Sequence, residues 1–280
     1  MTFDAWASET FDDSFRISVK VRQTLFAESS PYQKVEVFDT ERWGRVLMID
    51  GLFMTSERDE FVYHELLTHP ALCSAPAISR VVIIGGGDGG CAREVLRHPE
   101  VQSVSLVEID RLVVEASQKF LPSIGTAWDD PRLEVRIEDG VEYIANLPPA
   151  STDVILLDSS DPVGPAEGLF NATFFAACRR ALKPGGVLAL QSGSPFLMPK
   201  TFRDTQRVIA ESFGCVEPYF ANVPLYGSAI WSWTYASDQA TRYPKIAQRW
   251  GSIAETCKYY NLDIHDAVFA APTYVRRLLR

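Results

Sequence analysis

The sequence is poor in cysteine and has no pattern that would cluster its few thiols. Five cysteines are spread over 280 residues, and none belongs to a CxxC pair. An odd and scattered set argues against a disulfide framework and against a cysteine zinc site. A chain of this length can bury a substantial core without either kind of staple.

Long apolar runs and an excess of positive charge are also missing. No stretch approaches the roughly 20 apolar residues that cross a bilayer. The first 15 residues lack the basic and then apolar order of a signal peptide, so we expect a cytoplasmic protein. The 27 Lys and Arg residues against 36 Asp and Glu residues give a formal net charge of −9, which disfavours a nucleic-acid partner.

The histidines do not form a metal motif. Zinc-binding helices carry histidines at positions i and i+4, whereas His64 and His69 are five residues apart. That separation turns the second ring well away from the first. We therefore expect no metal ion, and we expect no prosthetic group.

What the sequence does contain is two different hydrophobic rhythms. Between about residues 15 and 55 apolar residues alternate with polar ones, which predicts antiparallel strands. A helix is expected at residues 57–72. From residue 80 onward short continuous apolar runs, typical of strands buried on both faces, alternate with helical segments. The runs lie at 81–84, 104–107, 133–137, 154–157 and 187–190, and the helical segments at 91–97, 113–120 and 172–182.

This order predicts an α/β protein with a Rossmann-like, doubly wound sheet whose ligands bind at the carboxyl ends of the strands. Aromatic-rich strands are expected near residues 230–235 and a helix near 243–255. We divide the chain into a small β-rich N-terminal domain with a linking helix, residues 1–75, and a Rossmann-like catalytic domain, residues 76–280.

A glycine-rich turn follows the first buried run. Gly85, Gly87 and Gly90 fit the GxGxxG pattern, which lets a nucleotide approach the backbone where a helix begins. Glu108 follows about 20 residues later, where an acidic side chain can accept the hydroxyls of a ribose. NAD enzymes and S-adenosylmethionine enzymes share this turn, so the pattern alone leaves the ligand open.

Asp88, inside that turn, discriminates between ligands. A carboxylate there would repel the pyrophosphate of a dinucleotide, which otherwise rests on the helix N-terminus. It would attract a cation, and decarboxylated S-adenosylmethionine carries both a sulfonium and an ammonium group. Ordinary S-adenosylmethionine has a carboxylate near that place. Asp88 therefore argues against NAD and mildly against a methyltransferase.

A second group of carboxylates ends the fourth buried run. Asp158 and Asp161 stand three residues apart, in a turn rich in proline and glycine. An alkylammonium ion has no lone pair and cannot attack carbon before it loses a proton. One aspartate can attract the ammonium and accept that proton, and the other can orient the amine. Asp139 and Gly140 end the third run, where they could meet an adenine or simply form a turn.

Three stretches closely resemble the spermidine synthases: residues 57–65, with the sequence ERDEFVYHE, residues 85–90 and residues 158–166, with the sequence DSSDPVGPA. The likeness runs in matching order from about residue 14 to about residue 270. It implies a fold of the S-adenosylmethionine methyltransferase kind behind an N-terminal β domain, and a homodimer or homotetramer. The implied reaction transfers an aminopropyl group from decarboxylated S-adenosylmethionine to putrescine, giving spermidine and methylthioadenosine.

The resemblance also assigns roles to residues. Asp158 is implied as the proton acceptor, and Asp161 as the residue that holds the attacking amine. The diamine channel is implied to be lined by Tyr63, Tyr226 and Trp231. Contacts with decarboxylated S-adenosylmethionine are implied for Gln33, His64, Asp88, Glu108, Asp139, Gly140, Pro165 and Leu169, to which the turn motif adds Gly85 and Gly87.

The sequence departs from the family pattern at two places. His64 stands where many members have Gln, although both side chains can donate a hydrogen bond. Gly193 stands where many members carry a Glu that helps hold the far amine of the substrate. Other acceptors therefore stay open: agmatine, cadaverine or a longer polyamine. An S-adenosylmethionine-dependent amine methyltransferase and a non-catalytic nucleotide-binding protein are the remaining alternatives.

Overall fold

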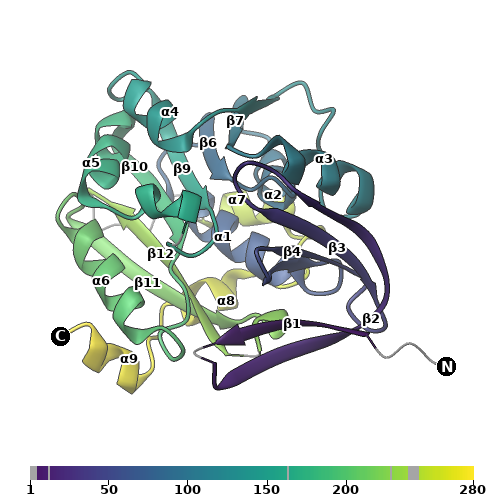
Figure 1. Cartoon of the computed structure of the whole chain (residues 1–280). Helices are drawn as coiled ribbons and strands as arrows, with labels where there is room; N and C mark the ends of the chain where they lie inside the picture. The colour runs from purple at the N-terminus through teal and green to yellow at the C-terminus, as the bar shows by residue number, and fades with distance from the viewer. Residues whose placement is uncertain (1–4, 12, 163, 228, 239–245) are drawn as a thin grey trace.

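The structure is a computed structural model that describes residues 5–11, 13–162, 164–227, 229–238 and 246–280. It contains two sheets that lie side by side, with the N-terminal sheet at one end of the molecule (Figure 1). Among the described residues, no helix is both long enough and apolar enough to cross a membrane.

The N-terminal sheet is an antiparallel meander. Its five strands pair in chain order: β1 (Ala5–Phe11), β2 (Phe15–Ser29), β3 (Lys34–Thr40), β4 (Arg45–Ile49) and β5 (Leu52–Ser56). The alternation around Ile17–Val21, Val35–Val37 and Val46–Met48 falls on β2, β3 and β4, as predicted. Strand β1 was not predicted, because its apolar residues are few and its pairing with β2 is what defines it.

The second sheet has seven strands in the order β11-β12-β10-β9-β6-β7-β8. Strands β6 to β10 are parallel, whereas β12 and β11 are antiparallel additions at one edge. Their bounds are β6 (Arg80–Gly85), β7 (Ser103–Glu108), β8 (Leu133–Ile137), β9 (Thr152–Asp158), β10 (Leu182–Gln191), β11 (Cys215–Asn222) and β12 (Ile230–Ser237).

Helices cover both faces of this sheet, which explains the continuous apolar runs. In β6, Val81 and Ile83 pack with the core around helix α1, while Val82 and Ile84 pack with the core around α4 and α5. Every second residue of the strand is thus buried on each side. The helices are α1 (Glu60–Ser74), α2 (Gly90–Leu96), α3 (Arg111–Phe120), α4 (Gly140–Asn146), α5 (Ala172–Ala181), α6 (Pro199–Ala210), α7 (Ile246–Ile253), α8 (Leu262–Ala267) and α9 (Thr273–Leu278).

These layers confirm the predicted Rossmann-like, doubly wound sheet with a β-rich N-terminal part. Helix α7 covers part of the helix expected at 243–255, and residues 243–245 lie outside the described residues. Helices α4, α6, α8 and α9 and strand β11 were not predicted.

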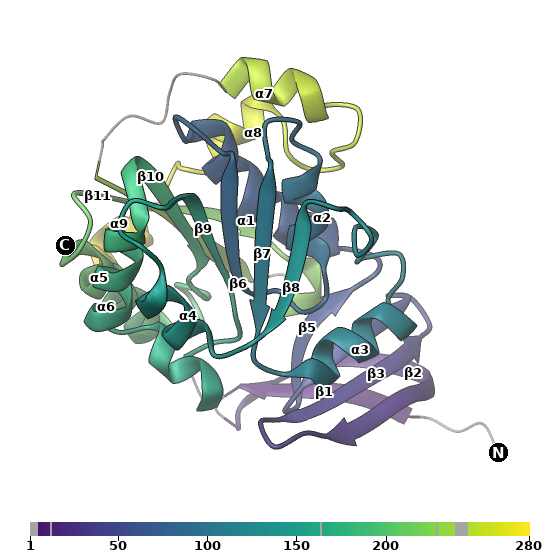
Figure 2. The same cartoon turned by 90° about the horizontal axis from the view of Figure 1, so that it is seen from above.

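Helix α1 links the two sheets and is almost entirely buried; only Phe61 among its residues keeps partial exposure. It packs against β9, β10 and β12 of the larger sheet and against α2. Figure 2 shows it beneath the parallel strands, while α3 lies over the N-terminal sheet and contacts β3. The division of the chain at residue 75 stays a prediction.

Candidate active site

A pocket opens where the strand order reverses. The chain runs outward from β6 to β7 and β8, then returns to the other side of β6 as β9, so β6 and β9 flank the switch point at which such sheets bind ligands. The N-terminal sheet closes the pocket from the side. Of the fourteen predicted site residues whose side chains the structure describes, thirteen line it: Gln33, Tyr63, Gly85, Gly87, Asp88, Glu108, Asp139, Gly140, Asp158, Asp161, Leu169, Tyr226 and Trp231.

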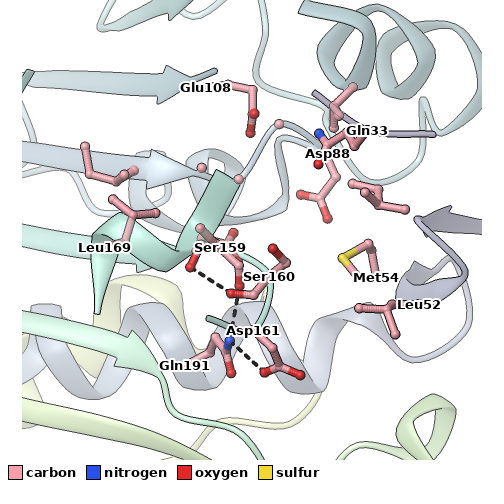
Figure 3. A pocket seen from close by; sticks show the side chains of 18 of the residues that line it. Gln33, Leu52, Met54, Asp88, Glu108, Ser159, Ser160, Asp161, Leu169 and Gln191 are labelled. Carbon is pink, nitrogen blue, oxygen red and sulfur yellow. Dashed lines mark hydrogen bonds between the residues drawn. The ribbon is translucent and has the colours of Figure 1, made fainter. Parts of the chain in front are cut away.

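Figure 3 shows how these side chains are distributed. Glu108 and Asp88 lie toward one end of the pocket, and Asp161 and Gln191 toward the other, with Leu52 and Met54 of the N-terminal sheet along the side. Carboxylates therefore stand at both ends of a cavity with partly apolar walls. Such a cavity suits an elongated ligand that carries more than one positive charge.

Asp158, the last residue of β9, lies at the centre of this arrangement. The backbone N–H of Gly86 donates to the Asp158 carbonyl oxygen over 2.8 Å, which ties the glycine turn to the end of β9. The Tyr63 hydroxyl donates to Asp158 Oδ1 over 2.9 Å. Asp158 Oδ2 is buried and accepts no hydrogen bond among the described residues. The thiol of Cys91 also lies near this carboxylate and lowers the pKa of Asp158 in part.

The electrostatics of Asp158 favour proton uptake. Burial raises the pKa of its carboxyl above the usual value, and the nearby negative charge of Asp88 raises it further. One ring nitrogen of His64 and one carboxylate oxygen each of Asp88 and Asp158 lie within 4.8 Å of one another. A buried carboxylate with an unused oxygen and a raised pKa is suited to accept a proton from a bound ammonium ion.

Asp88 is held through both of its oxygens. Oδ1 accepts the backbone N–H of Gly90 at the start of α2 over 2.8 Å, and Oδ2 lies 3.2 Å from Nε2 of His64. Burial alone would raise the pKa of Asp88, but the charge and hydrogen bond of His64 outweigh it and lower the pKa. Asp88 is therefore an anion at neutral pH, as the attraction of a cationic ligand requires.

Glu108 ends β7, and it is buried beside the same pocket. Its Oε1 accepts the backbone N–H of Asp110 over 3.0 Å. Burial raises the pKa of Glu108 to about 7, with a further contribution from the charge of Asp110. Gln33, from the loop before β3, donates to Asp110 Oδ2 over 3.1 Å, so the N-terminal sheet and the end of β7 are joined at the place predicted to bind a ribose.

Aromatic rings form the wall beside Asp158. Tyr63 and Tyr226 are in edge-to-face contact with ring centroids 6.1 Å apart, and the Trp231 ring lies 4.6 Å from Tyr226. The Tyr226 hydroxyl donates to the Met54 carbonyl oxygen over 2.6 Å. Asp59 accepts the backbone N–H of Leu225 over 2.7 Å and so fixes the short turn that carries Tyr226. These hydrogen bonds and ring contacts fix the position of the wall, and aromatic ring faces are suited to a cationic amine.

The far end of the pocket contains one residue that sequence reasoning missed. Glu9 of β1 lines the pocket, is 7% exposed and accepts the backbone N–H of Phe53 over 2.9 Å. Burial raises the pKa of Glu9 to about 7, and the charge of Asp161 contributes to the rise. The sequence could have indicated Glu9 because it is a carboxylate at a buried position of the alternating segment 5–11. That position is evident only when the segment is known to be a strand, β1.

Asp161 lies at this same end. Gln191, at the end of β10, donates to Asp161 Oδ1 over 3.3 Å and to the Ser159 carbonyl oxygen over 3.2 Å (Figure 3). Burial raises the pKa of Asp161, although the Gln191 hydrogen bond lowers it in part. Asp161 and Glu9 together make a second acidic region, apart from Asp88 and Glu108.

Among the predicted residues whose side chains the structure describes, His64 alone does not line the pocket. His64 lies behind Asp88 and is 1% exposed. Pro165 falls within the short 3-10 helix at Gly164–Leu169, and its side chain lies outside the described residues. Asp139 does line the pocket, and its Oδ1 also accepts the backbone N–H of Val141 over 2.7 Å, so it caps α4. The roles assigned to all fifteen residues stay predictions.

Comparison with known proteins assigns the family. The spermine/spermidine synthase domain matches residues 60–245, and the spermidine synthase tetramerisation domain matches residues 5–57. The chain belongs to the spermidine synthase family. The membership predicted from the three sequence stretches is thereby confirmed, and so is the enzyme class, an aminopropyltransferase of the spermidine synthase type.

Individual proteins of the family match this chain over nearly their whole length. The polyamine aminopropyltransferase of Prochlorococcus marinus (strain MIT 9313) is 49% identical over 260 residues, 92% of this chain and 91% of the relative. That of Bacillus subtilis (strain 168) is 42% identical over 277 residues, 99% of each chain. Among solved structures, a spermidine synthase in complex with the transition state analogue AdoDATO has a TM-score of 0.92 at 35% identity, covering 98% of this chain and 94% of that one. The Thermotoga maritima spermidine synthase has a TM-score of 0.91, also at 35% identity, covering 99% and 94%.

Many family members were expected to carry Glu at the position of Gly193. The backbone conformation at Gly193 does not readily accept that side chain. Its φ of +72° lies in the left-handed region, and an added Cβ would be 3.0 Å from Met198 Cε and 3.8 Å from Asp161 Oδ1. We expect the Gly193→Glu variant to lose about 1–3 kcal/mol of unfolding free energy, because non-glycine residues are strained there. We also expect no gain in acceptor selectivity, because the new carboxylate would face Asp161.

Chemical denaturation and competition between putrescine and cadaverine would measure both effects. Gly193→Asn is the matched control, since asparagine tolerates this backbone region better and adds no charge. Full stability of Gly193→Glu together with sharper selectivity would contradict the expectation.

Proposed function

We propose that this chain transfers the aminopropyl group of decarboxylated S-adenosylmethionine to putrescine, giving spermidine and methylthioadenosine. The observation that carries the proposal is Asp158: it lines a pocket that also contains Asp88 and has acidic residues at both ends, and its Oδ2 has no hydrogen-bond partner among the described residues. The solved relative that binds AdoDATO, a transition state analogue, supports the same donor.

The donor would occupy the half of the pocket between Glu108 and Asp88. Glu108, at the end of β7, lines the pocket and would accept the ribose hydroxyls. Gly140, Pro165 and Leu169 belong to the segments proposed to flank the adenine. Asp88 would hold the ammonium of the aminopropyl arm by a charge-assisted hydrogen bond. A donor that keeps its carboxylate would bring a negative charge to Asp88, which favours the decarboxylated form.

The acceptor would occupy the half that contains Asp161, Gln191 and Glu9. Asp158 Oδ2 would take a proton from the near ammonium of the diamine, and Asp161 would orient that nitrogen. Glu9 is the carboxylate proposed to attract the distal ammonium, in place of the Glu expected at position 193. Tyr63, Tyr226 and Trp231 would enclose the methylene chain.

The reaction is then a direct displacement. The deprotonated nitrogen attacks the aminopropyl carbon bonded to sulfur, the carbon–sulfur bond breaks, and its electron pair stays on sulfur. The sulfonium becomes the neutral thioether of methylthioadenosine, and the proton moves to Asp158. Because the leaving group is neutral, no acid has to protonate it. The main contribution of the pocket is to align two cations that repel each other in water.

A product assay separates this proposal from its alternatives. The purified protein is incubated with putrescine and with either sulfonium compound, and the products are identified by mass spectrometry. Transfer of an aminopropyl group supports the proposal, whereas transfer of a methyl group would show an amine methyltransferase. Turnover of agmatine, cadaverine or a longer polyamine with neglect of putrescine would replace the acceptor while the reaction class stays. Absence of any product would favour a non-catalytic nucleotide-binding protein.

The pH dependence of acceptor binding tests Glu9. Its pKa is raised to about 7, so Glu9 is mostly neutral below that pH and becomes an anion above it. The amines of putrescine stay protonated throughout this range because alkylammonium ions titrate near pH 10. We expect the KM for putrescine to fall about tenfold between roughly pH 6 and pH 8, as a charge-assisted hydrogen bond forms.

Steady-state kinetics of Glu9→Gln provide the check. That variant should keep a high KM for putrescine at both pH values, while the KM for the donor should vary with pH as in the unaltered enzyme. The opposite result, a putrescine KM in Glu9→Gln that still falls with pH, would assign the effect to another carboxyl group.

We also propose that the protein is a homodimer or a homotetramer that assembles through the segment matched by the tetramerisation domain, residues 5–57. Exposed aromatic side chains on this segment, Trp6, Phe15 and Tyr32, support an interface there. Sedimentation equilibrium measures the assembly. A cytoplasmic location stays a prediction.

A further inference from the structure

A row of buried charged groups lies directly behind Asp88, outside the pocket lining. His64 of α1 places its Nδ1 2.7 Å from Glu60 Oε2 and its Nε2 3.2 Å from Asp88 Oδ2. Arg93 of α2 donates to the same Glu60 oxygen over 2.6 Å. Glu60 is 5% exposed and Arg93 10% exposed. The groups therefore follow one another in the order Arg93, Glu60, His64, Asp88.

The imidazole is placed to carry a proton on each ring nitrogen. Both nitrogens face carboxylate oxygens, and a carboxylate accepts hydrogen bonds but does not donate them. Burial opposes a charge on the ring, but the carboxylates of Asp88 and Glu60 outweigh burial and raise the pKa of His64 well above its usual value. The titratable and charged groups around the ring are Glu60 and Tyr63 on α1, Asp88 before α2, Arg93 on α2 and Asp158 at the end of β9.

The four charges in this row alternate in sign, so each carboxylate lies beside a positive group. Glu60 offsets the charge of His64, and Arg93 is paired with Glu94 over 2.7 Å as well as with Glu60. Because Glu60 shares the charge of His64, the ring offsets the negative charge of Asp88 only in part. Glu94 is paired in turn with Arg97, so it adds no net charge to the row. Without Glu60, a charged His64 would offset the negative charge of Asp88. A neutral His64 would in that case contact only one carboxylate, that of Asp88.

The packing around the ring makes the row rigid. A Cβ on Gly90 would overlap the His64 ring, so the ring lies directly against the Cα of the first residue of α2. The N–H of this same residue donates to Asp88 Oδ1. Both oxygens of Asp88 are thus held by groups that are in contact with each other. Any shift of the ring would move the carboxylate that faces the pocket.

We propose that Glu60 and Arg93 are positioning residues of the donor site, which keep His64 doubly protonated and through it fix the place and the net charge of the Asp88 carboxylate. The proposal rests on the function proposed above for the donor. The role expected for His64 changes accordingly. The imidazole ring acts on the donor through Asp88, and the charge of the ring depends on Glu60 of α1 and Arg93 of α2.

The protonation state of His64 can be measured without any substrate. In the unliganded protein labelled with ¹⁵N, the ring nitrogens of four histidines give separate NMR signals, and the His64 signals are those lost in His64→Gln. We expect both His64 nitrogens to stay protonated well above pH 6.5, where an ordinary histidine titrates. In Glu60→Gln the His64 titration should move down toward that ordinary value. The control Glu115→Gln, at an exposed position of α3, should leave it unchanged.

Kinetics test the consequence for the donor. Glu60→Gln should raise the KM for decarboxylated S-adenosylmethionine roughly ten- to a hundredfold, because it removes the charged partner of a buried hydrogen-bonded group. The increase should vary with pH across the new His64 titration, and the KM for putrescine should change little. Glu60→Asp, which keeps the charge, should restore much of the donor affinity, and Arg93→Lys should show a smaller loss than Glu60→Gln.

Three outcomes would overturn the proposal: a neutral His64 at pH 7 in the unaltered protein, a His64 titration that Glu60→Gln does not move, or an unchanged donor KM in a folded Glu60→Gln variant. Should Glu60→Gln not fold, Arg93→Lys carries the same NMR and kinetic comparison. An enzyme with another donor would fail the product assay and still give the expected NMR result, so the two failures are distinguishable.

Discussion

Replacing Asp158 with Asn is expected to lower kcat by roughly 10²–10⁴-fold, the usual contribution of a positioned general base. The asparagine keeps the size of the side chain and can still accept the Tyr63 hydroxyl, which donates to Asp158 Oδ1 over 2.9 Å. It loses the unused oxygen that would take the proton. The amine would then stay protonated and without a lone pair, so the displacement itself should slow.

Single-turnover kinetics with both substrates bound would measure this loss apart from binding. Calorimetry should find the affinity for the donor nearly intact, because Asp88 and Glu108 are unchanged. Asp161→Asn is the matched control: it should raise the KM for the acceptor more than it lowers kcat. A kcat for Asp158→Asn within a few-fold of the unaltered enzyme would place the base elsewhere.

Replacing Asp88 with Asn should have the second largest effect, on binding of the donor. Truncating one partner of a buried, hydrogen-bonded charge pair typically costs about 2–5 kcal/mol, and each 1.4 kcal/mol is about tenfold in Kd. The affinity for decarboxylated S-adenosylmethionine should fall by this amount. The affinity for S-adenosylmethionine should fall much less, because its carboxylate no longer meets a negative charge.

The variant should therefore lose its preference between the two sulfonium compounds, which titration calorimetry measures directly. Methylthioadenosine is the matched control ligand: it carries no aminopropyl arm, so its Kd should change little. Equal affinity of the unaltered protein for both sulfonium compounds would contradict the role given to Asp88. A loss of methylthioadenosine binding in Asp88→Asn would instead indicate a general collapse of the turn.

Local sequence patterns predicted the parallel strands of the larger sheet and several of the pocket residues. Continuous apolar runs such as Val81–Ile84 predict a sheet covered on both faces, and the structure has helices on both. Parallel strands end at one edge of a sheet, so residues that follow them, such as Glu108 and Asp158, had to come close together. Local patterns were sufficient for these residues because each of them lies at the end of a strand or in the turn that follows it.

The groups that surround those residues come together only through long-range packing of the folded chain. Glu9 enters the pocket because β1 pairs with β2 and the N-terminal sheet packs over the switch point, contacts that no short window of sequence contains. The grouping of Glu60, His64, Asp88 and Arg93 depends on α1 packing against α2. Burial then sets the pKa values that distinguish Glu9 and Glu108 from solvent-exposed carboxylates. Sequence spacing shows where carboxylates occur along the chain, whereas their charge depends on neighbours and desolvation, which arise only on folding.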